Sequence, residues 1–165
     1  LTAESFTEDG FFRTGDRGEL RPDGMLKITG RTKELFKTAK GKYVAPAPIE
    51  NRLNAHPLVE QALVSGVGQS AAYALVVLAE DLRPKLGDAA VRAKVQQELG
   101  DLLRDVNQAV ADYEQLRMIV VAPQAWTIEN GMLTPTMKIR RSRIEAEFEA
   151  QLAHWYTSQG PVHWA

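Results

Sequence analysis

The sequence predicts an α+β fold, in which a small sheet of about three strands carries packed helices and follows a β-hairpin. Three observations support this class. Residues 59–67, 73–80 and 117–122 are apolar runs of strand length. Residues 91–113 place apolar side chains at steps of three and four, the period of a helix with one buried face. A Pro-Asp-Gly turn at residues 22–24 favours a hairpin. We expect the sheet to lean towards antiparallel pairing.

The N-terminal third is predicted to contain two hairpins and a short helix. The first hairpin pairs residues 18–21 with 25–29, and a second surrounds residues 38–42. Pro48 begins a helix over residues 48–55, because its missing N–H costs nothing in a first helical turn. The apolar arms of the second hairpin are Leu35, Phe36, Tyr43 and Val44.

Glycines and a capping residue mark the predicted turns and helix ends in the rest of the chain. The Gly-x-Gly at residues 66–68 lacks a third glycine and precedes a strand, so it predicts a turn and not a dinucleotide loop. Asp88 is a candidate cap for the long helix, and Gly100 is a candidate break within it. Residues 126–129 are a candidate short strand. The tail after Ser158 gives no signal. A final helix is predicted from Ile144, Phe148, Leu152 and Trp155.

Composition limits the kinds of site that the chain can hold. It has 165 residues, a formal net charge of −1 and no cysteine. Disulfides and thiolate metal sites are excluded, and the three histidines lack metal-ligand spacing, so no metal site is predicted. The balanced charge argues against a nucleic-acid partner. No apolar run approaches the roughly 20 residues of a membrane span, and a cytoplasmic location is the default prediction.

Positive charge is concentrated in residues 30–50. Two glycines and a proline exit would hold this basic hairpin where it can meet phosphate groups. The alternative is a solvated basic loop with no ligand. The cations, opposed only by Glu34, are Arg31, Lys33, Lys37, Lys40 and Lys42.

This segment resembles the hinge motif of the adenylate-forming enzymes, which include acyl-CoA synthetases, luciferases and peptide-synthetase adenylation domains. The match is GR-x-KE-x-x-K, then a glycine and V-x-P-x-x-IE, and FKTAKGKYVAPAPIE is most similar to the long-chain fatty acyl-CoA synthetases. The resemblance implies that Arg31 contacts the nucleotide and that Lys33 is the pivot between two domains. It implies that Lys37 approaches the adenylate in the second half-reaction. It extends to Lys40 and Lys42 as cofactor contacts, in a loop one residue longer than in some branches.

The segment F-x-TGD-x-G, which begins at Phe12, is similar to a stretch that precedes this hinge in the same family. By itself, an aspartate beside a glycine more often bonds the backbone of a turn. The resemblance implies that Asp16 binds the two ribose hydroxyls of the nucleotide. A carboxylate suits that role because it only accepts hydrogen bonds and can take two donors at once.

A second motif lies about a hundred residues later, before the last helix. Residues 133–141 resemble the family's C-terminal lysine motif, L-T-P-T-x-K-x-(K/R)-R. The match implies that Lys138 is the catalytic lysine of adenylation, where an ammonium offsets the negative charge that gathers on phosphate oxygens. Without the resemblance, a lone lysine would be a surface group. Arg140, Arg141 and Arg143 are expected to be structural or to contact CoA phosphates.

The resemblance implies the C-terminal portion of an ATP-dependent long-chain fatty acid–CoA ligase. Residues 1–31 would end a large N-terminal adenylation domain of the same polypeptide, and residues 32–165 would form a mobile lid. The implied ligands are a fatty acid, ATP or AMP, CoA and Mg²⁺, with the Mg²⁺ ligands outside this chain. The start at Leu1 and the missing Ser/Thr/Gly-rich phosphate loop indicate a piece that is inactive alone.

Two alternatives stay open at this point. The chain could belong to an adenylation domain that loads a carrier-protein thiol, which would approach by the same hairpin. It could also be a free-standing, non-catalytic module that binds a nucleotide or a partner. For an enzyme with fatty substrates, peripheral contact with the inner face of a membrane is left open, although no segment argues for it.

Overall fold

The computed structural model describes residues 3–165, and the side chains at positions 3, 30 and 33 lie outside the description. Its centre is a four-stranded mixed sheet in the order β5-β6-β7-β8. β5 (Val59–Ser65) and β6 (Ala72–Leu78) pair antiparallel, whereas β7 (Leu116–Val121) is parallel to β6, and β8 (Val162–Trp164) is parallel to β7. The predicted α+β class is confirmed, but two of the three strand pairs are parallel and the predicted antiparallel leaning is wrong.

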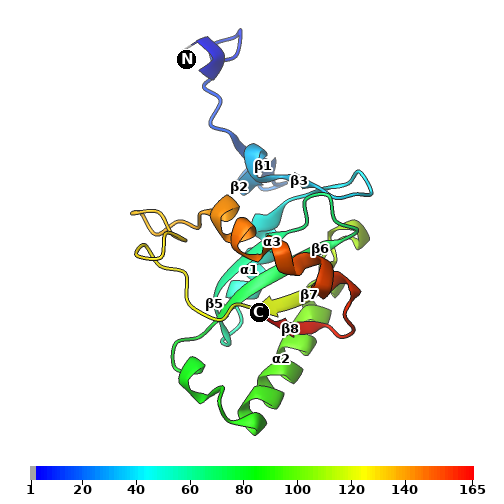
Figure 1. Ribbon diagram of the computed structural model, residues 1–165. Coiled ribbons are helices and arrows are strands. Elements are labelled where there is room, and N and C mark those ends of the chain that lie inside the picture. Colours follow the sequence, from blue (N-terminus) through cyan, green and yellow to red (C-terminus); the bar gives the residue numbers. More distant parts are fainter. Residues whose placement is uncertain (1–2) are drawn as a thin grey trace.

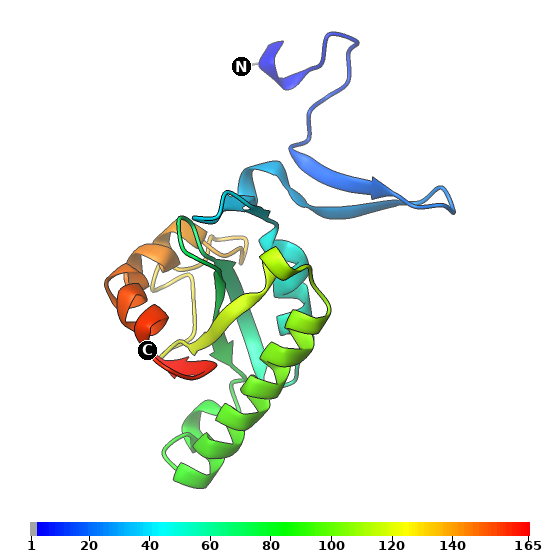
Figure 2. The ribbon, with the colours of Figure 1, turned by 90° about the vertical axis from the view of Figure 1, so that its right-hand side faces the viewer.

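Helices cover both faces of this sheet, as Figure 2 shows. α1 (Pro46–Asn54) and α2 (Ala89–Gln108) lie on one face, and α3 (Arg141–Thr157) lies on the other. Every residue of β6 is buried. Ala72, Ala74, Val76 and Leu78 pack in the cluster with α1 and α2, and Tyr73, Leu75 and Val77 pack with α3. This alternation is the period of two that a strand imposes when both of its faces are covered.

Helix α2 carries the apolar stripe predicted from the sequence. Asp88 caps it, since its carboxylate accepts hydrogen bonds from Ala90 N at 2.7 Å and Val91 N at 3.2 Å. Gly100 does not divide the helix. One helical glycine costs about 1 kcal/mol, which the burial of several large side chains exceeds. The buried residues of α2 are Val95, Leu99, Leu102, Leu103 and Val106.

The N-terminal hairpin of β1 (Asp16–Leu20) and β2 (Leu26–Arg31) extends away from the core, together with the short 3₁₀ turn η1 (Ala3–Ser5) (Figure 1). A second 3₁₀ turn, η2 (Thr32–Glu34), leads from β2 to the core. The predicted pivot Lys33 falls in η2, but its side chain lies outside the described residues. The division of the chain after residue 31 stays a prediction.

The basic hairpin is formed by β3 (Phe36–Lys37) and β4 (Tyr43–Val44) and is fixed to the core. Ala39 N donates to Gln69 O at 2.8 Å, and Gly68 N donates to Lys37 O at 3.0 Å. These bonds join it to the turn between β5 and β6. Gly66 is required in that turn, because a Cβ there would lie 2.8 Å from the Ala72 Cα. The predicted turn at residues 66–68 is confirmed.

Three elements differ from the sequence predictions. Residues 126–129 form no strand; instead, Trp126 exchanges two backbone hydrogen bonds with the Gln61 side chain, both at 2.9 Å. The tail after Ser158 is not featureless, because it returns to the sheet as β8. Helix α1 begins at Pro46, two residues before the predicted start at Pro48.

Two further 3₁₀ turns are η3 (Arg83–Lys85) and η4 (Asp112–Glu114). Within residues 3–165, no helix has the length and apolar character needed to cross a membrane.

We expect Asp88→Ala to lower the free energy of unfolding by about 1 kcal/mol, because two amides at the start of α2 lose their acceptor. Urea unfolding of the chain followed by circular dichroism measures this change. The matched control is Asp81→Ala. The Asp81 carboxylate is highly exposed and pairs with Lys85 at 3.9 Å, so its loss should matter little. Equal destabilisation by both substitutions would contradict the capping role.

Candidate functional site

A cleft of about 410 Å³ lies where the β1–β2 hairpin meets the start of α1 and the end of the loop before α3. It brings together side chains that are far apart in the sequence. Three of the predicted site residues, Asp16, Arg31 and Lys138, line this one cleft. The other charged residues that line it are Glu34, Glu50 and Arg141.

Asp16 and Arg31 face each other across the β1–β2 ladder. They are register partners, and Arg31 Nε lies 3.3 Å from Asp16 Oδ1. Thr32, which follows β2, holds the residue before β1 in place: its backbone N and its hydroxyl both donate to Gly15 O, at 2.8 and 3.0 Å. Gly15 has a φ of +77°, a conformation that favours glycine. The pair is open to solvent, with side-chain exposures of 33% for Asp16 and 59% for Arg31. A ligand can therefore reach both groups.

Lys138 sits in a tight loop that Thr134 closes from both sides. Thr134 N donates to Lys138 O at 2.8 Å, and Lys138 N donates to the Thr134 hydroxyl at 3.0 Å. Leu133 and Ile139 form an antiparallel bridge beneath the loop. Met137 has a φ of +61° and is the single non-glycine residue with positive φ among those described. Such a conformation costs about 1 kcal/mol or more and is typical of functional loops.

Arg141 anchors the end of this loop. Its Nη2 donates to Glu50 Oε1 at 2.8 Å, and its Nη1 donates to Val64 O at 2.8 Å. The same Glu50 oxygen accepts from Val64 N at 2.8 Å. The sequence predicts that Arg141 is structural or contacts CoA, and it predicts no role for Glu50. Both lie inside the two recognised motifs, but nothing in the sequence indicates that they meet.

The basic hairpin lies on the other side of the domain from the loop that carries Lys138 (Figure 1). Lys37, Lys40 and Lys42 are exposed and do not line the cleft of Asp16 and Lys138. Lys37 Nζ lies 5.7 Å from the centre of the Tyr43 ring, a cation–π contact. The structure therefore divides the predicted cations between two separate places. One holds Arg31 and Lys138, and the other holds the three hairpin lysines.

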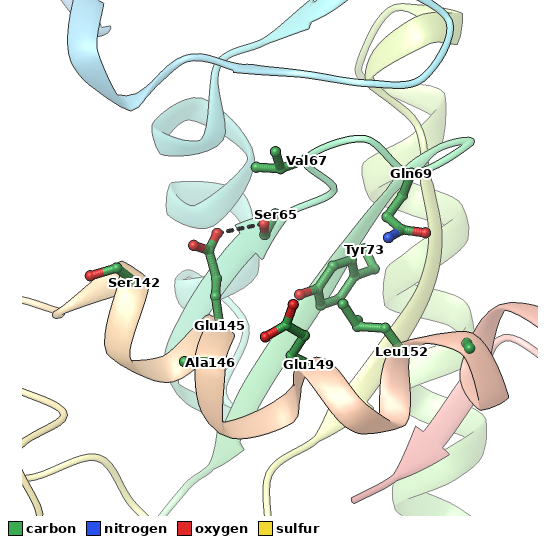
Figure 3. A pocket seen from close by; sticks show the side chains of 10 residues that line it. Ser65, Val67, Gln69, Tyr73, Ser142, Glu145, Ala146, Glu149 and Leu152 are labelled. Atoms are coloured by element: carbon green, nitrogen blue, oxygen red, sulfur yellow. Dashed lines mark hydrogen bonds between the residues drawn. The ribbon is translucent and has the colours of Figure 1, made fainter.

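A larger cleft, of about 540 Å³, opens between α3 and the β5–β6 turn (Figure 3). Ser65 donates to Glu145 at 2.6 Å, and Glu149 lies on the same wall. Burial raises the pKa of Tyr73 to about 12, so its hydroxyl stays neutral. Two carboxylates line this cleft and no cation does, so it would repel a phosphate. The smaller cleft, which Lys138, Arg31 and Arg141 line, offers the positive charge that this one lacks.

Metal binding finds no support in the part of the chain that the structure describes. Residues 3–165 contain no cluster of three or more His, Asp or Glu side chains that could hold an ion.

Comparison with known proteins decides the family. The sequence profile of AMP-binding enzyme C-terminal domains matches residues 33–160. The chain belongs to this family. The adenylate-forming family inferred from the two motifs is thus confirmed.

Among curated relatives of this AMP-binding domain are long-chain-fatty-acid–CoA ligases. The chain is 36% identical over 170 residues to FadD15 of Mycobacterium tuberculosis, covering 96% of this chain and 28% of that protein. It is 33% identical over 172 residues to human long-chain-fatty-acid–CoA ligase 1, covering 95% of this chain and 24% of that protein. The chain spans about a quarter of the length of these relatives.

Solved structures with the same fold include adenylation domains of carboxylate reductases. The domain from Mycobacterium chelonae matches with a TM-score of 0.78 and 30% identity, over 95% of this chain and 25% of that one. A didomain from Segniliparus rugosus, solved with AMP, matches with a TM-score of 0.75 and 32% identity, over 94% and 22% of the two chains. The fold is thus that of an adenylate-forming enzyme's C-terminal portion.

We expect Thr134→Val to speed hydrogen exchange at the Lys138 amide roughly fivefold or more. The hydroxyl that accepts from this amide is lost, and such a bond contributes about 1 kcal/mol. Residue-resolved exchange by NMR measures the effect. Thr136→Val is the matched control, because the Thr136 hydroxyl contacts Thr134 Oγ1 at 3.0 Å and not the Lys138 amide. An unchanged rate in Thr134→Val would show that the loop is held by other contacts.

Proposed function

We propose that the chain is the C-terminal portion of an ATP-dependent long-chain fatty acid–CoA ligase. In this reaction a fatty acid and ATP form an acyl-adenylate and pyrophosphate, and CoA then displaces AMP to give acyl-CoA. The observation that carries the proposal is the shared cleft of Lys138, Asp16 and Arg31. The names of the curated relatives favour a fatty acid and CoA as substrates.

The cleft suits the first half-reaction. A carboxylate oxygen of the fatty acid attacks the α-phosphorus of ATP, and pyrophosphate leaves with the electron pair of the broken P–O bond. The Lys138 ammonium, which lines the cleft on a hydrogen-bonded loop, would offset the charge on the phosphate oxygens. Asp16 would accept hydrogen bonds from the ribose hydroxyls, and Arg31 beside it would contact the nucleotide. Lys138 is thus the proposed catalytic group.

The basic hairpin suits the second half-reaction. The CoA thiol attacks the acyl carbonyl, loses its proton, and AMP leaves as the acyl–phosphate bond breaks. Lys37 lies on the hairpin and is exposed, and in this proposal it would approach the adenylate. Lys40 and Lys42, also exposed, would contact the cofactor phosphates. Because this hairpin and the Lys138 loop are on opposite sides of one core, the domain must turn to present both to one site. We assign the turn to the segment around Lys33.

The rest of the active site belongs to other parts of the protein in this proposal. An N-terminal domain of the same polypeptide would supply the phosphate loop and the fatty-acid pocket, with the boundary near residue 31. The chain alone would therefore be inactive. Mg²⁺ would accompany ATP without ligands from this chain.

We also propose a cytoplasmic location for the protein, with peripheral contact to the inner membrane face as a variant of this proposal. Cell fractionation distinguishes the two, because only the variant predicts protein in the membrane fraction.

An adenylation domain that loads a carrier-protein thiol is the second candidate. The solved carboxylate reductase structures keep it open, since one of them is a didomain of an adenylation and a carrier domain, but they do not make it the better candidate. Both candidates use the same two half-reactions and differ in the thiol. Thioester formation with free CoA and with a phosphopantetheinylated carrier protein, measured side by side, distinguishes them.

In the full-length ligase, we expect Lys138→Ala to lower ATP–pyrophosphate exchange with a fatty acid about 100-fold or more, since one charge-stabilising group is lost. Thioester formation from pre-made acyl-adenylate and CoA should stay within about twofold. Lys94→Ala, on the exposed face of α2, is the matched control. The isolated chain, which is proposed to be inactive, gives the background rate of ATP–pyrophosphate exchange in the same assay. If Lys138→Ala leaves exchange at the wild-type rate, Lys138 is a surface lysine and the proposed function fails.

Lys37→Ala is expected to show the opposite pattern. Thioester formation from the acyl-adenylate should fall roughly 10-fold, because a charge-assisted hydrogen bond contributes about 1.5–3 kcal/mol. ATP–pyrophosphate exchange should change less than about twofold, since Lys37 does not line the Lys138 cleft. Stopped-flow measurement of CoA consumption follows the step. A loss confined to exchange would place Lys37 in the first half-reaction and refute the assignment.

A further inference from the structure

We propose that Glu50 and Arg141 form a positioning pair that sets the place of Lys138 for adenylate formation. The inference rests on the proposed function, because it concerns the same lysine and the same half-reaction. It adds two residues to the site and connects the two sequence motifs physically. Glu50 closes the hinge motif, and Arg141 closes the lysine motif.

The pair completes the hydrogen bonding of an edge strand. β5 is at the edge of the sheet, so Val64 has a peptide N–H and C=O with no neighbouring strand on that side. Glu50 accepts from Val64 N at 2.8 Å, and Arg141 donates to Val64 O at 2.8 Å. Glu50 and Arg141 then bond to each other at 2.8 Å. One carboxylate, one guanidinium and the backbone N–H and C=O of one residue, Val64, thus form a closed ring of three contacts.

This ring joins three elements at one point. Glu50 comes from α1, on one face of the sheet, and Arg141 is the first residue of α3, on the other face. Val64 lies between them on β5. The side chains are 13% exposed for Glu50 and 23% for Arg141, so the contacts are partly shielded from water. Such shielding strengthens the attraction and holds the geometry.

Lys138 is connected to this ring through two residues of backbone, Ile139 and Arg140. The bond from Arg140 N to Met132 O, at 2.8 Å, closes the chain between the loop and the anchor. The loop itself is fixed internally by Thr134. A displacement of Arg141 therefore moves the whole loop, and Lys138 with it. A placement error of about 1 Å is enough to slow a reaction on the order of 100-fold.

The pair also governs charge in the cleft. Glu50 lines the same cleft as Lys138, and without a partner its carboxylate would attract the lysine. Arg141 occupies that carboxylate instead. Stability alone gives a weak reason for two shielded charges, because well-packed apolar residues often stabilise a protein as much. The joint location with Lys138, Asp16 and Arg31 favours a role in positioning.

The test uses the full-length ligase and Glu50→Gln, which keeps an acceptor for Val64 N but removes the charge. We expect kcat for ATP–pyrophosphate exchange to fall about 10-fold. The KM for ATP and the rate of thioester formation from acyl-adenylate should change less than about twofold. In a Lys138→Ala background, Glu50→Gln should cause no further loss of exchange. Glu98→Gln, which breaks the exposed pair with Lys94 on α2, is the matched control and should leave both rates unchanged.

Arg141→Lys provides a second variant in case Glu50→Gln fails to fold. It keeps the charge, but a lysine cannot bond Glu50 and Val64 with the fixed fork of a guanidinium, so exchange should fall while thioester formation persists. Equal losses in both half-reactions, or an added loss in the Lys138→Ala background, would overturn the inference. If Lys138→Ala loses exchange but Glu50→Gln does not, only the inference fails. If Lys138→Ala retains exchange, the proposed function fails first.

Discussion

The burial of β6 on both faces is the constraint on which the rest of the domain depends. A strand with all seven residues buried needs a helical layer on each side, and α1 with α2 and then α3 supply those layers. In the part of the chain that the structure describes, this packing leaves the edge of the sheet and the loops at its ends open to solvent. The Lys138 loop, the β3–β4 hairpin and the edge strand β5 at Val64 all occupy such positions. The site residues are thus carried by loops on a rigid scaffold.

Local sequence signals predicted the local structure well. The stripe of α2, its Asp88 cap and the turn at residues 66–68 each follow from patterns within one element. The parallel pairing of β7 and the strand β8 could not be predicted in this way. β8 has three residues and gains its order by pairing with β7, some forty residues earlier in the chain. Trp126 misled the strand prediction, because its side chain packs in the hydrophobic cluster under α3 while its backbone bonds to the Gln61 side chain and not to a neighbouring strand.

The candidate site shows the same division between local and distant information. The motifs identified Asp16, Arg31 and Lys138 as residues of one family, and that resemblance implied that they serve one nucleotide. Their shared cleft depends on how the β1–β2 hairpin meets α1 and the loop before α3, which no spacing reveals. The Glu50–Arg141 contact joins residues 91 positions apart. Neither side chain has an apolar period or a metal spacing that would have singled it out.

The charges of the cleft give a physical reason for the proposed role of Lys138 at a phosphate. Arg31 is paired with Asp16, and Arg141 is paired with Glu50. Among the described residues, no carboxylate forms an ion pair with Lys138. The charge of a paired cation is already partly offset by its carboxylate, whereas a lysine in this state exchanges only water when it binds an anion. Its loop is already ordered by Thr134, so little further conformational freedom is lost on binding. An unpaired ammonium on a prearranged loop is therefore the group in this cleft that can respond most strongly to charge that develops on a phosphate.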